Sequence, residues 1–282
     1  GFYFKHDLAA LKELASSAAE IGIERFGLDD GGFKGRDNDD SSLGDWQVDA
    51  RKYPQGLEPL ARHVTGLGME FGLWVEPEMV NPDSDLYRAH PDWALHVDGR
   101  PLLGARNQLV LDLTRPEVVH YLIASLSPLL ERLPIRYLKW DHNRNLTHAG
   151  NTPLYRRQVR AAYGLFEHFR AAFPSVEIEA CAGGGGRIDA GILGHTHRFW
   201  ASDCIDAVSR VGIQRGFLQF MPPEVMGSHV GASPAHSTGR MQAMDFRAAV
   251  GLPGHFGGGI DLRKGKGAER EGLRRALSRY KG

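Results

Sequence analysis

The segment from Lys139 to Arg144 contains the side chains of this sequence that are best suited to catalysis. The carboxylate of Asp141 stands two positions after Lys139 and two before Asn143, behind the apolar stretch 135–138, which reads as a buried strand. Because residues two apart in a strand point to the same face, we expect Lys139 and Asp141 to lie together. A cation and an amide lower the pKa of a neighbouring carboxyl group, so Asp141 is predicted to be ionised and able to act as a nucleophile.

Further acids follow other strand-like stretches, and aromatic residues accompany them. The acids are Asp29, Asp30, Glu76, Glu78 and Asp203, and the aromatic residues are Phe33, Trp46, Trp74, Trp140 and Trp200. Carboxylates accept hydrogen bonds from hydroxyl groups and ring faces pack on a pyranose, so this combination indicates a sugar site. Two carboxylates, one a nucleophile and one an acid/base, would cleave a glycosidic bond. Taken singly, each acid could instead cap a helix.

Metal, phosphate and disulfide chemistry have less support. The chain has 13 histidines but no His-Glu-x-x-His motif, and we expect His195 and His197 to lie in a surface turn before a strand, so no metal site is predicted. The glycines at 183–186 lack the Lys and Ser/Thr of a phosphate-binding loop. Cys181 and Cys204 are the only cysteines, and we expect two reduced thiols.

Strand-like and helix-like stretches alternate along the chain. Strands are expected at 23–28, 69–75, 135–140, 176–180, 198–201, 225–230 and 254–260, and helices at 7–21, 56–67, 116–133, 155–173 and 208–220. This alternation predicts a mostly parallel sheet. Polar residues and glycines fall just after the strands, which favours a single (β/α)8 TIM barrel over residues 1–282 with its site at the carboxyl ends of the strands. A doubly wound sheet is the competing α/β fold.

The composition narrows the class of partner. Lys plus Arg and Asp plus Glu both total 34 of the 282 residues, so no bulk charge favours nucleic acid or an anionic membrane. No apolar stretch approaches membrane-spanning length, and no signal peptide is evident. The chain does not begin with Met, and residues 2–4 resemble the tail of a strand. We therefore expect an excised domain whose first barrel strand is clipped.

Several motifs resemble those of glycoside hydrolase family 36, the bacterial-type α-galactosidases. They are Leu28-Asp29-Asp30-Gly31, Leu43-Gly44-Asp45-Trp46, Glu76-Pro77-Glu78-Met79, His90-Pro91-Asp92-Trp93, Arg106-Asn107-Gln108, the run from Lys139 to Arg144, Cys181 with Gly184-Gly185-Gly186-Arg187, and Trp200-Ala201-Ser202-Asp203. These motifs occur in the family's order over nearly the whole chain. The Glu-Pro-Glu-Met and Lys-Trp-Asp-x-Asn-Arg patterns are the most specific of them.

The resemblance implies a retaining exo-hydrolase of terminal α-galactosides such as melibiose and raffinose, with no metal or organic cofactor. Asp141 would be the nucleophile and Asp203 the general acid/base, and in a retaining enzyme their carboxyl groups lie roughly 5–6 Å apart. The implied sugar-binding residues are Asp29 and Asp30 for the 4- and 6-hydroxyls, Arg106, Lys139 and Asn143 near the nucleophile, Cys181 and Gly183 beside the 2-hydroxyl, Trp200 as a pocket wall, and Asp206.

Three other functions stay open. Two are enzyme activities on the same scaffold, α-N-acetylgalactosaminidase and raffinose-type transgalactosylase. The third is a truncated domain that binds galactose without turnover. It is motivated by Gly32, where the family usually carries a tryptophan, and by the expected loss of the family's flanking β domains. Those missing domains imply that the full-length protein is a homo-oligomer, and the bacterial family implies a cytoplasmic location.

Overall fold

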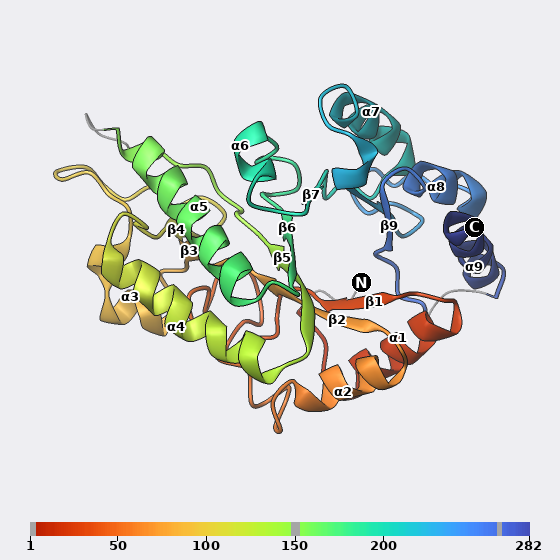
Figure 1. The fold of residues 1–282 in the computed structure, drawn as a ribbon, viewed down its shortest axis with the longest axis horizontal. Helices are drawn as coiled ribbons and strands as arrows, with labels where there is room; N and C mark the ends of the chain where they lie inside the picture. Colours follow the sequence, from red (N-terminus) through yellow and green to blue (C-terminus); the bar gives the residue numbers. More distant parts are fainter. Residues whose placement is uncertain (1–3, 148–152, 264–266) are drawn as a thin grey trace.

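The computed structural model describes residues 4–147, 153–263 and 267–282. Within these ranges the strands are β1 (Arg25–Leu28), β2 (Glu70–Val75), β3 (Met79–Val80), β4 (Leu109–Val110), β5 (Ile135–Trp140), β6 (Glu177–Ala180), β7 (Arg198–Trp200), β8 (Met226–Val230) and β9 (His255–Gly258). The α-helices are α1 (Leu8–Glu20), α2 (Glu58–Gly66), α3 (Asp85–Ala89), α4 (Pro116–Arg132), α5 (Leu154–Ala172), α6 (Ala190–Leu193), α7 (Ala207–Phe217), α8 (Met244–Gly251) and α9 (Gly267–Lys281). Figure 1 shows their arrangement.

Seven strands form one parallel sheet whose order follows the chain, β1-β2-β5-β6-β7-β8-β9. The sheet curls, and α1, α2, α4 and α5 lie along its outer side (Figure 1). β3 and β4 make a separate antiparallel pair. Successive strand–helix units produce such an order, whereas a doubly wound sheet reverses its order at a switch point. The predicted parallel α/β sheet is confirmed, and the doubly wound alternative is wrong.

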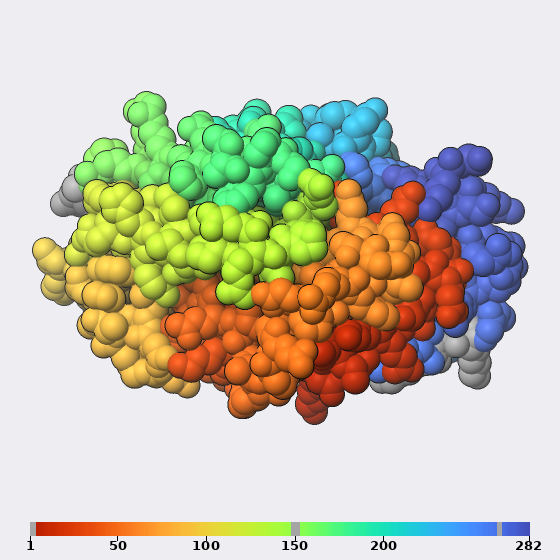
Figure 2. Space-filling view, turned by 60° about the horizontal axis from the view of Figure 1, so that its bottom comes forward, coloured from red at the N-terminus to blue at the C-terminus, as the bar shows by residue number. Residues whose placement is uncertain are grey.

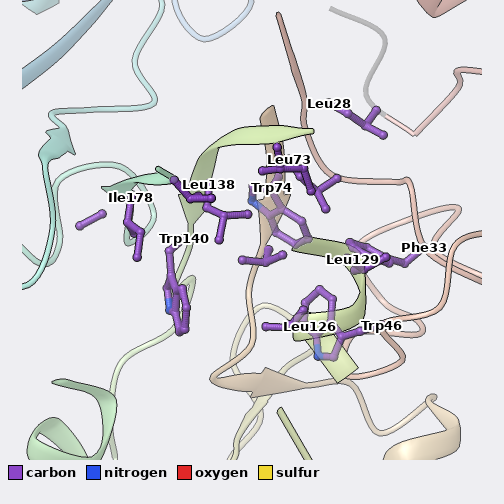
Figure 3. Close-up of a cluster of buried hydrophobic side chains, with 14 of the residues drawn as sticks. Leu28, Phe33, Trp46, Leu73, Trp74, Leu126, Leu129, Leu138, Trp140 and Ile178 are labelled. Carbon is purple, nitrogen blue, oxygen red and sulfur yellow. The ribbon is translucent and has the colours of Figure 1, made fainter. Parts of the chain in front are cut away.

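The helices pack on the sheet through apolar stripes. α4 begins at Pro116, which suits the first turn of a helix because its missing N–H has no helical partner there. Its buried residues Val118, Leu122, Leu126 and Leu129 are spaced four, four and three apart, so they lie on one face. Figure 3 shows Leu126 and Leu129 in the cluster that also holds the tryptophans of β2 and β5. This packing fixes the strands whose ends carry the predicted site.

The register of the sheet aligns the residues that follow its strands. Trp140, the last residue of β5, pairs with Val75 of β2. The backbone N–H of Asp141 donates to the carbonyl of Val75 (2.8 Å), and that of Cys181 donates to the carbonyl of Trp140 (2.8 Å). The residues that directly follow β2, β5 and β6 are therefore aligned across the sheet, just beyond the carboxyl ends of these neighbouring strands. They are Glu76, Asp141 and Cys181.

The first and last helices meet through polar contacts. Arg270 of α9 forms an ion pair with Glu20 of α1, and the ammonium of Lys281 bonds the carbonyl of Gly22 (2.7 Å) and the carboxylate of Glu24 (3.0 Å). In the space-filling view of Figure 2, the red surface of the N-terminal region adjoins the blue surface of the C-terminal region. No backbone ladder joins β9 to β1 among the described residues.

Most predicted boundaries agree with the structure to within two residues. The helix expected at 208–220 ends at Phe217, and the strand expected from 225 begins at Met226 because Pro223–Val225 forms a 3-10 turn. The helices α3, α6, α8 and α9 and the strands β3 and β4 were not predicted. The expected strand tail at 2–4 lies outside the described residues except for Phe4, which is in a turn.

In the described part of the chain, no helix combines the length and the apolar character that crossing a membrane requires.

Candidate active site

Asp141 lies at the carboxyl end of β5 with only 6% of its surface exposed. Its Oδ2 accepts a hydrogen bond from Trp74 Nε1 (3.1 Å), and its Oδ1 accepts one from the backbone N–H of His142 (2.9 Å). The thiol of Cys181 is a further neighbour that favours the charged form of this carboxylate. These contacts hold the carboxylate in one orientation, as a nucleophile in an enzyme requires.

The charge of Asp141 is stabilised by its neighbours. Burial alone would raise the pKa of Asp141, but the Lys139 ammonium, the hydrogen bond from Trp74 and the neighbouring Cys181 and Asn143 side chains outweigh it and hold that pKa below its usual value. Burial opposes the charge of Lys139 as well, yet the carboxylates of Asp29 and Asp141 raise its pKa well above the usual range. The prediction that Lys139 and Asn143 depress the pKa of Asp141 is confirmed, and Asp141 is ionised at neutral pH.

Asp203 follows β7 and, unlike Asp141, is exposed. Its Oδ1 accepts a hydrogen bond from Trp200 Nε1 (2.9 Å). A Cβ on Gly184 would come within 2.8 Å of the backbone nitrogen of Asp203, and Gly184 has φ +86°, so this close approach requires glycine. Burial and the charges of both Asp141 and Asp203 raise the pKa of the Cys181 thiol. Both acids thus lie near Cys181, at the same end of the sheet.

Two side chains contact the ring of Trp200 and help to fix its position. The ammonium of Lys139 is 5.1 Å from the ring centroid, and the imidazole of His229 stacks against the ring with centroids 4.5 Å apart and planes at 12°. His229 is buried, and this burial lowers its pKa well below the usual value, so the imidazole is neutral at neutral pH. The tryptophan predicted as a pocket wall therefore has a rigid support from β8.

The two acids that follow β1 have different partners. Asp30 forms a bidentate ion pair with the buried guanidinium of Arg36, through Nε (2.9 Å) and Nη2 (2.8 Å). Burial nevertheless raises the pKa of Asp30. Asp29 is 63% exposed at its side chain and pairs with Lys139 Nζ at 3.0 Å. Lys139 therefore links the predicted hydroxyl-binding pair to the predicted nucleophile.

Arg106 and Asn143 complete the side of the site next to Asp141. Asn143 Oδ1 accepts hydrogen bonds from Arg106 Nη1 (2.9 Å) and from the backbone N–H of Gly183 (3.0 Å). Arg106 and Asn107 have φ of 51° and 58°, in the left-handed region that costs a non-glycine residue on the order of 1 kcal/mol or more. Strain of this kind is concentrated at binding and catalytic sites, where it fixes the direction of a side chain.

Asp206 requires a correction. It has no exposed surface, and it is the N-cap of α7, where it accepts hydrogen bonds from the backbone N–H of Val208 and from the hydroxyl of Ser209 (2.8 Å). It also pairs with Arg240 Nη1 at 2.6 Å. Burial raises the pKa of Asp206, but Ser209 and Arg240 outweigh this effect and hold that pKa below its usual value. The carboxylate is committed to these partners, so we reassign Asp206 from a sugar contact to a helix cap.

Of the other acids noted in the sequence, Glu78 is structural. It is buried and accepts hydrogen bonds from Trp140 Nε1 (2.9 Å) and from Arg187 Nη1 (2.6 Å). Burial alone would raise the pKa of Glu78, but the charges of Arg187 and His142 and these hydrogen bonds hold it below the usual value.

His195 lies in a turn before β7, as predicted. No cluster of metal-ligating side chains occurs in the described ranges.

A cavity of about 500 Å³ adjoins the site. Arg106, Asn143 and Gly183 belong to both, whereas Asp141 and Asp203 do not line the cavity. Residues of α5, including Gln158 and Tyr163, also line the cavity. There is thus open space beyond the predicted sugar contacts on the side of Gly183.

Replacing Lys139 tests the electrostatic support of Asp141. Lys139→Met removes the cation that lowers the pKa of Asp141, so that pKa rises and the acid limb of the pH profile of kcat/KM moves upward, by about 1 pH unit. The control is Lys34→Met, because Lys34 is exposed and pairs with Asp85 on the surface. An acid limb that stays in place in Lys139→Met contradicts the electrostatic role.

Comparison with known proteins gives one consistent family. The Melibiase family model matches residues 1–282. The alpha-galactosidase of Escherichia coli is 48% identical over 283 residues, which cover 100% of this chain and 40% of that protein. The solved GH36 alpha-galactosidase AgaA of Geobacillus stearothermophilus has a TM-score of 0.95 and 43% identity, over 100% of this chain and 40% of that one.

A variant of AgaA solved in complex with raffinose also has a TM-score of 0.95, at 43% identity over 99% of this chain and 40% of that chain. The present chain spans about two fifths of the length of these relatives. The resemblance that the motifs indicated is confirmed, because the family model covers every residue and the identities are high. The chain belongs to the Melibiase family.

Proposed function

We propose that this chain carries the catalytic site of a retaining α-galactosidase that hydrolyses terminal α-galactosidic bonds by double displacement. Asp141 attacks the anomeric carbon, and Asp203 protonates the leaving oxygen and then activates the water that releases galactose. The observation that carries the proposal is the contrast between the two acids. Asp141 is buried and held as a carboxylate, whereas Asp203 is exposed at the neighbouring end of the same site, where a leaving group can reach it.

The binding roles follow from the charge pattern around Asp141. Asp29 and Asp30 offer acceptors to hydroxyl protons, and Arg106 and Lys139 offer donors. Asn143, Cys181 and Gly183 border the nucleophile, and the face of Trp200 covers the sugar. The proposed substrates are galacto-oligosaccharides such as melibiose and raffinose. A relative at 43% identity has been solved with raffinose, which supports this choice.

We further propose that the seven consecutive parallel strands belong to a (β/α)8 barrel and that residues 1–282 form a single catalytic domain. The unbroken strand order and the outer ring of helices support this proposal. The homo-oligomeric full-length protein and its cytoplasmic location are also proposals, and only the resemblance to the family supports them.

The test uses the 282-residue chain with raffinose and with nitrophenyl α-galactoside. Proton NMR of the first product formed should show α-galactose, since two inversions retain the configuration. β-Galactose as the first product would overturn the double-displacement mechanism. Calorimetry with galactose tests one of the alternatives: binding without hydrolysis would indicate a galactose-binding domain without turnover.

α-N-Acetylgalactosaminidase is the second candidate activity, and the cavity beside Gly183 favours it. An acetamido group replaces the 2-hydroxyl in that substrate, and the proposed position of the 2-hydroxyl is next to Cys181 and Gly183. The space of about 500 Å³ on that side could hold the extra atoms. A higher kcat/KM on nitrophenyl α-N-acetylgalactosaminide than on nitrophenyl α-galactoside would favour this candidate.

A further inference from the structure

Glu76 is the most deeply buried acid beside Asp141, and the mechanism above does not use it. It is the first residue after β2, and none of its surface is exposed, so it cannot touch a sugar. Its Oε1 accepts from the backbone N–H of Asn143 (2.5 Å), and its Oε2 accepts from Asn143 Nδ2 (2.9 Å). One carboxyl group thus holds both the main chain and the side chain of a single residue of the site.

These contacts determine which way the amide of Asn143 points. Because Nδ2 faces Glu76, Oδ1 must face the other way, where it accepts from Arg106 Nη1 and from Gly183 N–H. An amide turned by half a rotation would direct its NH₂ group at two donors, Arg106 and Gly183, and its oxygen at the carboxyl of Glu76. Glu76 therefore determines which end of the Asn143 amide donates hydrogen bonds and which end accepts them.

We propose that Glu76 is a positioning residue of the site: it sets the orientation of the Asn143 amide and, through Oδ1, the positions of Arg106 and the loop at Gly183. This inference rests on the proposed function for its catalytic consequence but not for the contacts themselves. The role requires an acceptor at both oxygens of residue 76. Glutamate meets this requirement, and the isosteric glutamine does not, because its NH₂ group would face Asn143 Nδ2.

Positioning by Glu76 also holds when the carboxyl group carries a proton. Burial and the negative charge of Asp141 raise the pKa of Glu76 to about 8, against the hydrogen bonds from Asn143 and the charge of Arg36. Gln108 Nε2 is 3.3 Å from Glu76 Oε2, and Gln108 Oε1 is buried with no hydrogen-bond partner among the described residues. If the Gln108 amide turns over, Oε1 accepts the proton of Glu76, and both carboxyl oxygens still accept from Asn143.

The experiment records the amide proton of Gly183 in ¹H–¹⁵N spectra of the 282-residue chain. In Glu76→Gln the Asn143 amide turns over, Gly183 N–H loses its acceptor, and its proton resonance moves upfield. In the double variant Glu76→Gln/Asn143→Asp, the introduced carboxylate accepts from the introduced amide on one oxygen and from Gly183 on the other, so the resonance returns downfield. The double variant swaps the donor and the acceptor of the pair. If Glu76→Gln acted only by destabilising the fold, adding Asn143→Asp would not restore the Gly183 resonance.

Glu179→Gln is the matched control. Glu179 is also a buried glutamate, on β6, but it pairs with Arg198. Its replacement should leave the Gly183 resonance in place. A Gly183 resonance unchanged in Glu76→Gln, or one that stays upfield in the double variant, overturns the proposal.

The catalytic consequence is measured separately. For nitrophenyl α-galactoside, kcat/KM of Glu76→Gln should fall by about 100-fold, because a displacement of about 1 Å at a site costs that much. Wild-type kcat/KM in Glu76→Gln would overturn the positioning role even if the spectra behave as expected. If the wild-type chain hydrolyses no α-galactoside while the spectra follow the expected pattern, the proposed function fails and the assignment of Glu76 to Asn143 stands.

Discussion

Asp141→Ala should reduce kcat on α-galactosides by on the order of 10⁴-fold, and sodium azide should restore turnover. The substitution removes the attacking carboxylate and leaves a small space next to the anomeric carbon. Azide can enter this space and attack from the face that the carboxylate occupied, so the product is β-galactosyl azide. The measurement combines steady-state kinetics with and without azide and NMR identification of the product.

Azide should not accelerate the wild-type chain, in which the carboxylate occupies that position, and this is the control. The result that contradicts the mechanism is an Asp141→Ala variant with wild-type kcat. Trp74 and the backbone of His142 lose their common acceptor in this variant. Circular dichroism and the thermal midpoint should therefore accompany the kinetics, to show that the loss of rate belongs to a folded protein.

Asp203→Ala is expected to lower kcat/KM by about 10³-fold for raffinose and much less for nitrophenyl α-galactoside. The sugar leaving group of raffinose needs a proton from Asp203, whereas nitrophenolate leaves without one. Hydrolysis of the galactosyl–enzyme intermediate also needs the base form of Asp203, so the nitrophenyl substrate should give a burst followed by slow turnover. The ratio of kcat/KM for the two substrates is the quantity that reports on the role.

Asp206→Asn is the matched control for Asp203, since both acids lie in the segment between β7 and α7. Asparagine keeps the helix cap but loses the charge that pairs with Arg240. This variant should lose stability and retain the wild-type ratio of kcat/KM between raffinose and the nitrophenyl substrate. If Asp206→Asn changes that ratio and Asp203→Ala does not, the acid/base role belongs to Asp206.

The arrangement around Asp141 was predictable because it depends on local spacing. Lys139 and Asp141 are two residues apart in a strand, and such residues share a face in any sheet. The stretch 135–140 could be recognised as a strand by its apolar residues, so the position of the acid at its carboxyl end followed. The parallel order of the sheet was equally accessible, because the helices α2, α4 and α5 are long enough to show a clear periodicity.

The errors in the site arose where one residue type has several uses. Asp206 directly precedes α7, and an acid at that position is a preferred N-cap, so the sequence did contain a signal for its true role. Glu76 was recognised as an acid after a strand, but whether such an acid faces the ligand or the protein depends on residues far away in the chain. Its partner Asn143 is 67 positions further on.

Arg36 and His229 carried no sequence signal at all. Arg36 reaches Asp30 from a loop without regular structure, and His229 is a single histidine in a strand whose neighbours show no alternation. Their roles depend on the close contact of Arg36 with Asp30 and of His229 with Trp200. Spacing along the chain cannot show either contact, because each results from the tertiary packing.

The contact between α1 and α9 has a consequence for how the fold responds to solution conditions. Ion pairs whose acids are 67% and 74% exposed join α9 to Glu20 of α1 and to Glu24 directly before β1, whereas backbone ladders join the seven strands to one another. Exposed ion pairs are screened at high ionic strength, and backbone ladders are largely insensitive to it. Concentrated sodium chloride should therefore loosen the seam between the two helices while the interior of the sheet keeps its protection from hydrogen exchange.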